Sequence, residues 1–400
     1  ALYGHADIDA EPQSGGRQMV AHFSTQSLNE DGSWRALTDQ YNSASDISCT
    51  AGQMPRLVGL AQASKVFREN KDLKDWTSFS KNGNEIAWGT IGNASTSEGH
   101  FFEAINAAGV LQIPMVMSVW DDGYGISVHS KHQTTKENIS EILKGFQRDK
   151  NGKGFEIIKV KGWDYPALIE AYEKAEKIAR KEHVPVLVHV IEMTQPQGHS
   201  TSGSHERYKS KERLQWESDF DCIDLFKEWI VSNSISNTEE LDALRAEIKK
   251  EVSKQKNTAW KAYQSPILSE LSLASQLLGE LINESSNGVF IKPIKEKLEF
   301  DAKLSPHRRN IFSALRSALR LVRGENTNAK QKIKTQLNLW NDENQDRYSS
   351  HLYSQSKQSI DKVESIEPSY NSDSEDVDAR VIIRNNFDAI LSKHPGVLFF

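Results

Sequence analysis

Two short loops carry the residue types of this chain that are best suited to bind a phosphate and a metal ion. The first loop, residues 92–99, follows an apolar run at Ile86–Ile91 and precedes a helical pattern. The second, residues 120–125, ends another apolar run at Val110–Trp120. Strand, loop, helix and strand make a βαβ unit, and ligands of parallel sheets bind beyond the carboxyl ends of the strands. We therefore expect both loops to face one crevice.

The residue types in the two loops indicate what the crevice would bind. Ser95, Thr96 and Ser97 are types that cap helix N-termini, where free backbone N–H groups bind phosphate. Asn93 and Asp122 offer hard oxygen atoms. A magnesium site typically combines one or two such groups with water and substrate phosphates. The spacing alone leaves an ordinary turn with a solvated acid equally open.

Both loops resemble the cofactor loops of thiamine diphosphate enzymes. That family has Gly-Asp-Gly in the first loop and Asn-Asn in the second, where this chain has Gly92-Asn93-Ala94 and Asp121-Asp122. From Asn93 to Asp122 is 29 positions (122 − 93), which suits the family. The family's Asp and Asn are thus exchanged, and the pair keeps one carboxylate.

The resemblance implies a set of binding residues. The metal, Mg²⁺, would be held by Asn93, Asp122 and the carbonyl group of Tyr124. The cofactor-binding residues that the resemblance implies are Gly92, Ala94, Ser95, Tyr124, Ile126 and His199. Asp121 adds a second negative charge, which either strengthens metal binding or stays outside the ligand shell.

Other segments follow the order found in α chains of the 2-oxoacid dehydrogenases. A glycine-rich segment at residues 14–19 and a Gly-x-x-Pro helix start at residues 52–55 precede the metal loops. The loop at residues 199–202, His-Ser-Thr-Ser, follows them and resembles the branched-chain members more than the pyruvate members. A histidine there would bind phosphate or move a proton, and we take His199 as the catalytic candidate.

One departure from the family affects the diphosphate. The family has Tyr-Arg a few residues before the histidine, and Gln195 and Pro196 stand there in this chain. Either the diphosphate is held differently, or Arg17 or another cation replaces the missing arginine. Without the resemblance, a single histidine in a loop is more often exposed than functional.

The strand and helix patterns predict an α/β fold with a doubly wound parallel sheet, and the resemblance implies the thiamine-diphosphate-binding fold. Further strands are expected at Phe155–Val160 and Val184–Met193, with a helix at Tyr165–His183 between them. Their Val, Leu and Ile content is typical of strands buried on both faces. Gly109 is expected to end the helix that follows the first loop.

The resemblance also divides the chain. Residues 1–262 would be an α-type domain, truncated at its N-terminus. Residues 263–380 combine helical segments with a polar stretch at Glu325–Asp378, which predicts a helical region and a linker. Residues 381–400, a helix followed by a strand, resemble the start of the β chain. The complete protein would then be an α–β fusion.

An arginine-rimmed amphipathic helix is expected at His307–Val322. Such a helix binds a membrane surface or an acidic partner, or it packs on its own protein. Packing on its own protein is the most common of these roles, and we predict it for this helix.

Composition excludes several classes of protein. The net charge of −6 gives no indication of nucleic acid or an anionic membrane as partner. No run of 18 apolar residues and no signal-peptide pattern occur, so we expect no membrane span. Cys49 and Cys222 are far apart and are expected to be buried free thiols in a reducing cytoplasm. The GxGxxG and P-loop motifs are absent.

The resemblance implies an oxidoreductase of a multienzyme complex. It would decarboxylate a 2-oxoacid, branched-chain or pyruvate, and transfer the acyl group to a lipoyl-bearing acyltransferase. The full-length fusion would form a homodimer. In this family the carboxylate that activates the cofactor comes from the β half. The present chain is therefore expected to supply the diphosphate and metal half of the site and to be inert alone.

Two other interpretations remain. A thiamine enzyme of the transketolase type shares the metal loops, although the segment order and the loop around His199 argue against it. A non-catalytic binding or assembly module would use the same fold, with the exchange of Asn93 and Asp122 marking lost metal binding.

Overall fold

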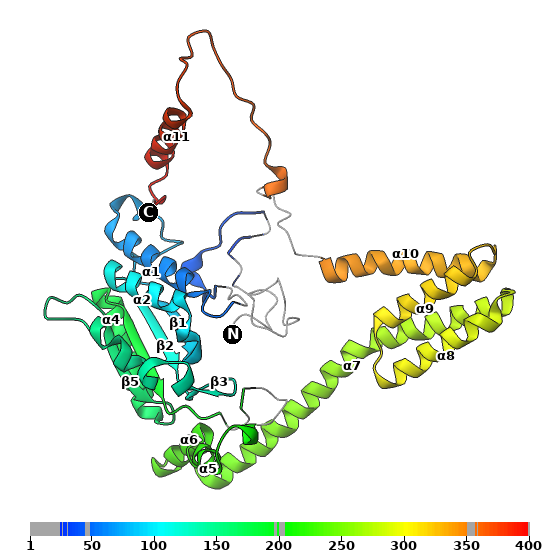
Figure 1. Cartoon of the computed structure of the whole chain (residues 1–400), viewed down its shortest axis with the longest axis horizontal. Coiled ribbons are helices and arrows are strands. Elements are labelled where there is room, and N and C mark those ends of the chain that lie inside the picture. Colours follow the sequence, from blue (N-terminus) through cyan, green and yellow to red (C-terminus); the bar gives the residue numbers. More distant parts are fainter. Residues whose placement is uncertain are drawn as a thin grey trace. The chain divides into compact units, whose positions relative to one another are not determined.

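The structure is a computed structural model of the 400-residue chain (Figure 1). The residues it describes are 25, 27–29, 31–44, 49–195, 198–199, 205–349, 357 and 359–398. The chain forms two compact units, Ala1–Ile235 with Ser354–Phe400, and Ser236–Tyr353. These divisions differ from the boundaries at 262 and 380 expected from the sequence. A single helix, α7 (Thr238–Glu284), runs across residue 262.

A parallel four-stranded sheet with the order β1-β2-β6-β5 forms the centre of the first unit. The strands are β1 (Ala87–Gly92), β2 (Met115–Trp120), β5 (Glu156–Lys161) and β6 (Val186–Ile191). β1 pairs with β2 in a register that runs from Ala87 opposite Met115 to Gly92 opposite Trp120. The structure confirms the predicted α/β class and its parallel sheet.

Helices pack against both faces of the sheet, because successive side chains of a strand point to opposite faces. Met117 of β2 lies in one core with residues of α1 (Met54–Glu69) and α2 (Gly99–Leu111). Val116, the preceding residue, lies in a second core with residues of α4 (Tyr165–Glu182). The sheet is therefore held in place from two sides, and its strand ends are fixed in space.

Helix α2 extends further than predicted. Gly109 was expected to end it, but the helix continues to Leu111 and ends at Gln112, whose φ of 50° is left-handed. Gly109 lies within the helix, and a Cβ there would lie 3.4 Å from the ring of Phe155. This is an ordinary van der Waals distance, so packing does not require a glycine there, and the prediction of a helix stop was wrong.

Short elements complete the first unit. They are η1 (Leu37–Asp39), η2 (Lys71–Leu73), η3 (Ala94–Ser97), β3 (Tyr124–Gly125), β4 (Val128–His129), η4 (Ser130–His132), η5 (Thr135–Glu137), α3 (Ile139–Ile142), η6 (Leu143–Phe146), η7 (His205–Arg207), α5 (Lys211–Asp219), α6 (Cys222–Ser232), η8 (Ile360–Lys362) and α11 (Ala379–Lys393). No strand follows α11 up to residue 398, where the described part ends. Cys49 is exposed and Cys222 half-buried, so the expectation of two buried thiols was wrong.

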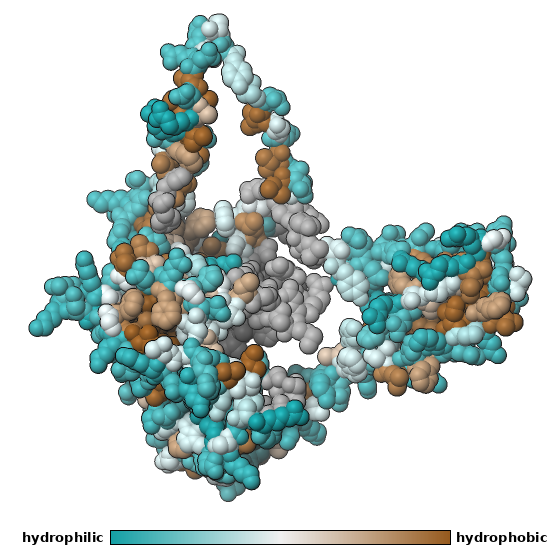
Figure 2. All heavy atoms as spheres, in the orientation of Figure 1, coloured by the Kyte–Doolittle hydropathy of each residue, from teal (hydrophilic) through white to brown (hydrophobic). Residues whose placement is uncertain are grey.

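The second unit is a helical bundle. Its helices are α7, α8 (Gly288–Leu304), α9 (Arg308–Leu321) and α10 (Asn328–Ser349). Figure 2 shows apolar residues, in brown, gathered between these helices. Ile311 and Leu315 of α9 are buried in the shared core, so this arginine-rimmed helix packs on its own protein.

Helix α10 corrects the prediction of a linker in the polar stretch. Ile333, Leu337 and Trp340 recur at helical spacing and are buried in the bundle core. The high polar content of the surrounding residues belongs to the exposed faces of the helix, so a linker prediction from composition was wrong here.

The two halves of α7 differ. Its first buried residue is Ile267, directly after Pro266, which lies inside the helix. From Asp242 to Tyr263 every residue is exposed. Among the described residues, no helix combines the length and the apolar composition of a membrane-spanning segment.

The bundle core predicts the outcome of a matched pair of substitutions in α7. Leu278 is fully buried and Leu268, in the same helix, is about half exposed. Leu278→Ala should lower the free energy of unfolding of the bundle by about 2–5 kcal/mol because it removes packing and leaves a cavity. Leu268→Ala should change it by less than about 1 kcal/mol. Urea denaturation followed by circular dichroism measures both, and equal effects would contradict the assigned core.

Candidate functional site

The carboxyl ends of β1 and β2 bring the two predicted loops together. The backbone N–H of Asn93 donates to the carbonyl of Trp120 at 3.0 Å, one step beyond the paired strands. The N–H of Asp121 donates to the carbonyl of Val190 in β6 at 2.9 Å. Asn93 and Asp122 therefore lie on adjoining strand ends, where the βαβ pattern predicted them.

The loops also touch further along. A Cβ on Gly125 would lie 2.6 Å from the Cβ of Ala94 and 2.4 Å from Nε2 of Gln133. Only glycine allows so close an approach without a shift of its neighbours. The hydroxyl of Ser97 donates to the carbonyl of Gln133 at 3.1 Å, which ties the end of the first loop to the same segment.

The expected hydroxyl cap of α2 is absent. Ser95, Thr96 and Ser97 lie in η3, and the N-cap residue of α2 is Glu98, without a side-chain cap hydrogen bond. The hydroxyl of Thr96 donates to the carbonyl of Asn93 and so closes the loop on itself. The sequence predicted the position of the loop, but the prediction that its hydroxyl residues cap the following helix was wrong.

Asn93 has an unsatisfied side chain. The residue is 4% exposed, and its Nδ2 atom has no hydrogen-bond partner in the described part of the chain. A buried polar group without a partner costs about 1–3 kcal/mol, so such groups are rare in folded proteins. The oxygen and nitrogen of an amide can exchange places by a flip, so this position offers either a donor or an acceptor to a ligand.

Asp122 lies in a partly desolvated position. Its Oδ1 accepts the N–H of Tyr124 at 3.0 Å. Burial raises the pKa of the Asp122 carboxyl above its usual range, and the hydrogen bond from Tyr124 and the charges of Lys209 and Arg213 offset only part of this effect. A raised pKa means that the fold favours the protonated form, so stability increases as pH falls through that pKa. At neutral pH the ionised carboxylate is a destabilising charge that a bound cation would neutralise.

The neighbouring acid, Asp121, is fully engaged by the protein. Its Oδ1 accepts the N–H of Gly123 at 2.9 Å, and its Oδ2 lies 3.0 Å from Nε2 of His189. His189 is fully buried in β6, and its Nδ1 lies 2.6 Å from the hydroxyl of Ser140. The two acids of the second loop thus differ: Asp121 is held by strand β6, and Asp122 uses one oxygen in the described hydrogen bonds.

A strained hairpin follows Asp122. Tyr124 and Gly125 of β3 pair with His129 and Val128 of β4, which leaves Ile126 and Ser127 in the turn. The φ of Ile126 is 59°, a region that β-branched residues strongly avoid. Its side chain is 65% exposed, so core packing does not explain the choice of isoleucine.

His199 is exposed, and the residue before it is tightly packed. Gly198 has a φ of 67°, and a Cβ there would lie 2.8 Å from the hydroxyl oxygen of Tyr208. The base of the loop is therefore fixed against the segment that leads into α5. The rest of this loop, residues 200–204, lies outside the described residues, as do the glycine-rich segment at 14–19 and Arg17 within it.

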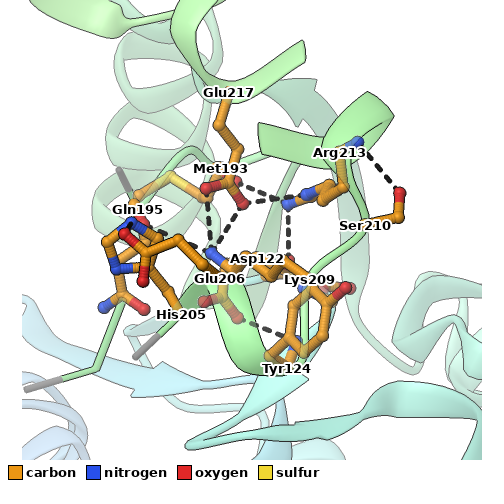
Figure 3. Close-up of polar contacts among 12 residues, drawn as sticks. Asp122, Tyr124, Met193, Gln195, His205, Glu206, Lys209, Ser210, Arg213 and Glu217 are labelled. Carbon is orange, nitrogen blue, oxygen red and sulfur yellow. Dashed lines mark hydrogen bonds and ion pairs between the residues drawn. The ribbon is translucent and has the colours of Figure 1, made fainter. Parts of the chain in front are cut away.

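The structure adds charged residues that the sequence did not single out. Lys209, Arg213 and Glu217 meet beside the backbone of Asp122 (Figure 3). The only signal in the sequence is the spacing of Arg213 and Glu217, four residues apart on a helix, which is common on solvated faces. His189 was missed as well, although a histidine within an apolar strand is unusual.

The residues present fit a hard cation with a phosphate ligand. Among the described residues no group of three or more His, Cys, Asp and Glu side chains is arranged to hold a metal. The predicted set contains only one such side chain, that of Asp122, and magnesium takes its remaining ligands from amide and carbonyl oxygens, water and phosphate. The unsatisfied amide of Asn93 and the desolvated carboxyl of Asp122 suit this kind of site.

The fold and the two loops define an α/β protein whose candidate ligand site lies at its strand ends. The sequence model of the dehydrogenase E1 component matches residues 14–267, more than half of the chain. The chain therefore belongs to the dehydrogenase E1 component family. This confirms the family resemblance that the sequence motifs predicted.

Several similar proteins are alpha subunits of 2-oxoisovalerate or pyruvate dehydrogenases. The mitochondrial 2-oxoisovalerate dehydrogenase subunit alpha 1 of Arabidopsis thaliana is 27% identical over 254 residues, 63% of this chain and 46% of that protein. The 2-oxoisovalerate dehydrogenase subunit alpha of Bacillus subtilis (strain 168) is 27% identical over 64% of this chain and 69% of its own length. The mitochondrial pyruvate dehydrogenase E1 component subunit alpha of Sminthopsis macroura is 28% identical over 50% and 49%. The chain thus spans about half the length of several of these relatives.

The environment of Asp122 predicts an unusual titration. A ¹³C NMR titration, with the carboxyl signal assigned through Asp122→Asn, should give an apparent pKa above the ordinary value of 3.8, because burial disfavours the charge. Addition of Mg²⁺ with inorganic pyrophosphate should lower this pKa, since a cation stabilises the carboxylate. An ordinary pKa, unchanged by the two ions, would refute the assignment of Asp122 as a desolvated ligand.

The hairpin predicts that Ile126→Gly stabilises the protein. A non-glycine residue at positive φ carries strain of about 1–3 kcal/mol, part of which is offset by the greater freedom of glycine in the unfolded chain. We expect the free energy of unfolding to rise by roughly 1 kcal/mol, as measured by urea denaturation. Val128→Gly, two residues further in a strand and 43% exposed, is the matched control and should destabilise. A loss of stability in Ile126→Gly would show that the turn is unstrained.

Proposed function

We propose that this chain is the α part of a thiamine-diphosphate-dependent 2-oxoacid dehydrogenase and supplies the diphosphate and metal half of its active site. The observation that carries the proposal is the buried, unsatisfied amide of Asn93, which adjoins the desolvated Asp122 on the next strand end. The names of the relatives favour branched-chain 2-oxoacids, with pyruvate second.

We assign the metal, Mg²⁺, to Asn93, Asp122 and the carbonyl of Tyr124. The cofactor diphosphate would lie against Gly92, Ala94 and Ser95 of the first loop. Gly92 is exposed and Ala94 and Ser95 are partly so, which leaves this backbone accessible to a ligand. Asp121 stays outside the ligand shell in this proposal, since both of its oxygens are engaged within the protein.

The mechanism divides between cofactor and protein. Thiamine diphosphate, when bound, supplies the electron sink that decarboxylation of a 2-oxoacid requires. Asn93 and Asp122 would hold the metal that binds the diphosphate end, and Ile126, held at positive φ, is an exposed apolar side chain that follows these loops. His199, exposed on its loop, is the group of this half that would bind substrate or move a proton.

The remaining parts of the proposal concern assembly. The lipoyl domain of an acyltransferase is the acceptor of the acyl group, as in the complexes to which E1 components belong. Helices on both faces of the sheet support the doubly wound thiamine-diphosphate-binding fold. Helix α11 would open a β-type half, and the fusion would form a homodimer. A cytoplasmic location is proposed from two cysteines that form no disulfide.

Calorimetry tests the proposal. Thiamine diphosphate should bind the chain only when Mg²⁺ is present, and Asp122→Ala or Asn93→Ala should weaken binding about ten-fold or more because a ligand is removed. Asp75→Ala removes an exposed acid outside the site and serves as the matched control. Binding that does not depend on Mg²⁺, or that survives Asp122→Ala, would contradict the metal assignment.

Substrate choice is tested with the α and β parts together. Release of CO₂ from carboxyl-labelled 2-oxoisovalerate should exceed release from pyruvate, and Asp122→Ala should abolish both. Turnover of a ketose phosphate donor instead of 2-oxoacids would identify a transketolase-type enzyme. Absence of thiamine diphosphate binding together with absence of turnover would identify a non-catalytic module.

A further inference from the structure

A buried ion pair joins α5 to the segment that precedes it. Nζ of Lys209 lies 2.8 Å from Oε1 and 2.9 Å from Oε2 of Glu217. Each side chain is only 1% exposed. Lys and Glu are almost never buried to this degree unless they are paired, so each of these two residues requires the other.

Arg213 extends the pair towards the second loop. It precedes Glu217 by four residues on α5, and its Nε donates to Oε1 of Glu217 at 2.8 Å. Its Nη2 donates to the backbone carbonyl of Asp122 at 2.8 Å (Figure 3). The planar guanidinium holds both contacts at once, so the position of Glu217 determines where the Asp122 backbone is held.

Lys209 extends the pair towards the histidine loop. Its Nζ also donates to the carbonyl of Gln195 at 3.2 Å, three residues before Gly198. An ammonium group has three donors, and the two oxygens of Glu217 and this carbonyl use all three. The N–H of Gly198 in turn donates to the same carbonyl at 2.9 Å.

The ring of Tyr124 lies beneath both cations. Nζ of Lys209 is 5.2 Å and the guanidinium carbon of Arg213 is 5.6 Å from the ring centroid. Both distances are within the range of cation–π attraction. Tyr124 is thus held in place through its side chain, while the backbone carbonyl of Asp122 is held by Arg213.

We propose that Lys209, Arg213 and Glu217 are positioning residues that fix the loop of Asp122 and Tyr124 relative to the base of the His199 loop. The inference rests on the proposed function for its meaning, because these loops carry the metal ligands and the catalytic candidate. The geometry itself is independent of any ligand. Glu217 is the centre of the arrangement, since it binds both cations.

The energetics of buried ion pairs distinguish a positioning role of Lys209 and Glu217 from a purely stabilising one. A buried ion pair is often no more stable than a pair of apolar residues of the same size, because desolvation of the charges offsets their attraction. Removal of one partner alone is destabilising, since it leaves an unpaired buried charge. Replacement of both Lys209 and Glu217 by apolar residues therefore removes the contacts that fix Gln195 and the side chain of Arg213, while the fold is kept.

The test is the double variant Lys209→Met with Glu217→Leu in the full chain. Arg213 remains, and because its side chain is 27% exposed its charge can be solvated. Hydrogen exchange of the Tyr124 and Gly198 amides should become at least ten-fold faster, because Gln195 loses the hydrogen bond from Lys209, and Arg213, which holds the carbonyl of Asp122, loses the bond that fixes it to Glu217. Exchange of Met117 in β2 should stay unchanged, and the midpoint of thermal unfolding should move by only a few degrees.

A matched control removes an ion pair of the same kind from the helical bundle. Arg308 and Glu270 are paired at 2.8 Å, with side chains 13% and 11% exposed. The double variant Arg308→Met with Glu270→Leu should leave the exchange of Tyr124 and Gly198 unchanged. Faster exchange of these amides in the control as well would attribute the effect to general loosening and would overturn the inference.

Binding provides the second measurement. The Lys209→Met, Glu217→Leu variant should bind thiamine diphosphate with Mg²⁺ about ten-fold more weakly than the unaltered chain. Unchanged exchange, or unchanged affinity in a variant that exchanges faster, overturns the positioning role. If the unaltered chain does not bind thiamine diphosphate, the proposed function fails, and the exchange rates alone decide whether the loops are positioned by the cluster.

Discussion

The parallel pairing of β1 with β2 is the interaction on which the site depends. Because side chains alternate along a strand, a shift of the register by one residue would turn every side chain to the opposite face. Ile91 and Val119, both buried in the core with α1 and α2, fix the register. In this register one more hydrogen bond forms beyond the strand ends, from the N–H of Asn93 to the carbonyl of Trp120. This bond places the first loop beside the second.

Unfavourable features gather at this one edge of the sheet. The amide of Asn93 is buried without a partner, the carboxyl of Asp122 is desolvated, and Ile126 holds a φ that suits glycine. Each feature lowers the stability of the unliganded chain, and the packed cores on both faces of the sheet offset the total loss of stability. Residues that break local rules are concentrated at functional sites, which is why these three together carry more weight than any one of them.

Local patterns were sufficient for the sheet but not for what surrounds the site. Apolar runs located β1 and β2, and the loop motifs located Asn93 and Asp122. The pattern of Ile333, Leu337 and Trp340 was also present in the sequence, but a polar composition concealed it. Lys209 lies before the start of α5 and Glu217 near its end, so their pairing depends on the folded path of the chain between them, which the sequence pattern does not encode. The pairing of Asp121 with His189 has the same origin, 68 residues apart.

The exposed half of α7 has a thermal consequence. Proline has no N–H, so Pro266 interrupts the hydrogen bonds that join this half to the half packed in the bundle core. With no buried residue before Ile267, the exposed half lacks the core packing that stabilises the rest of the helix, and a helix without such packing weakens on warming. It should therefore unwind before the bundle does. A residue spans 1.5 Å in a helix and at most about 3.3–3.6 Å when fully extended, so the greatest distance that residues 242–263 can span increases when this half unwinds.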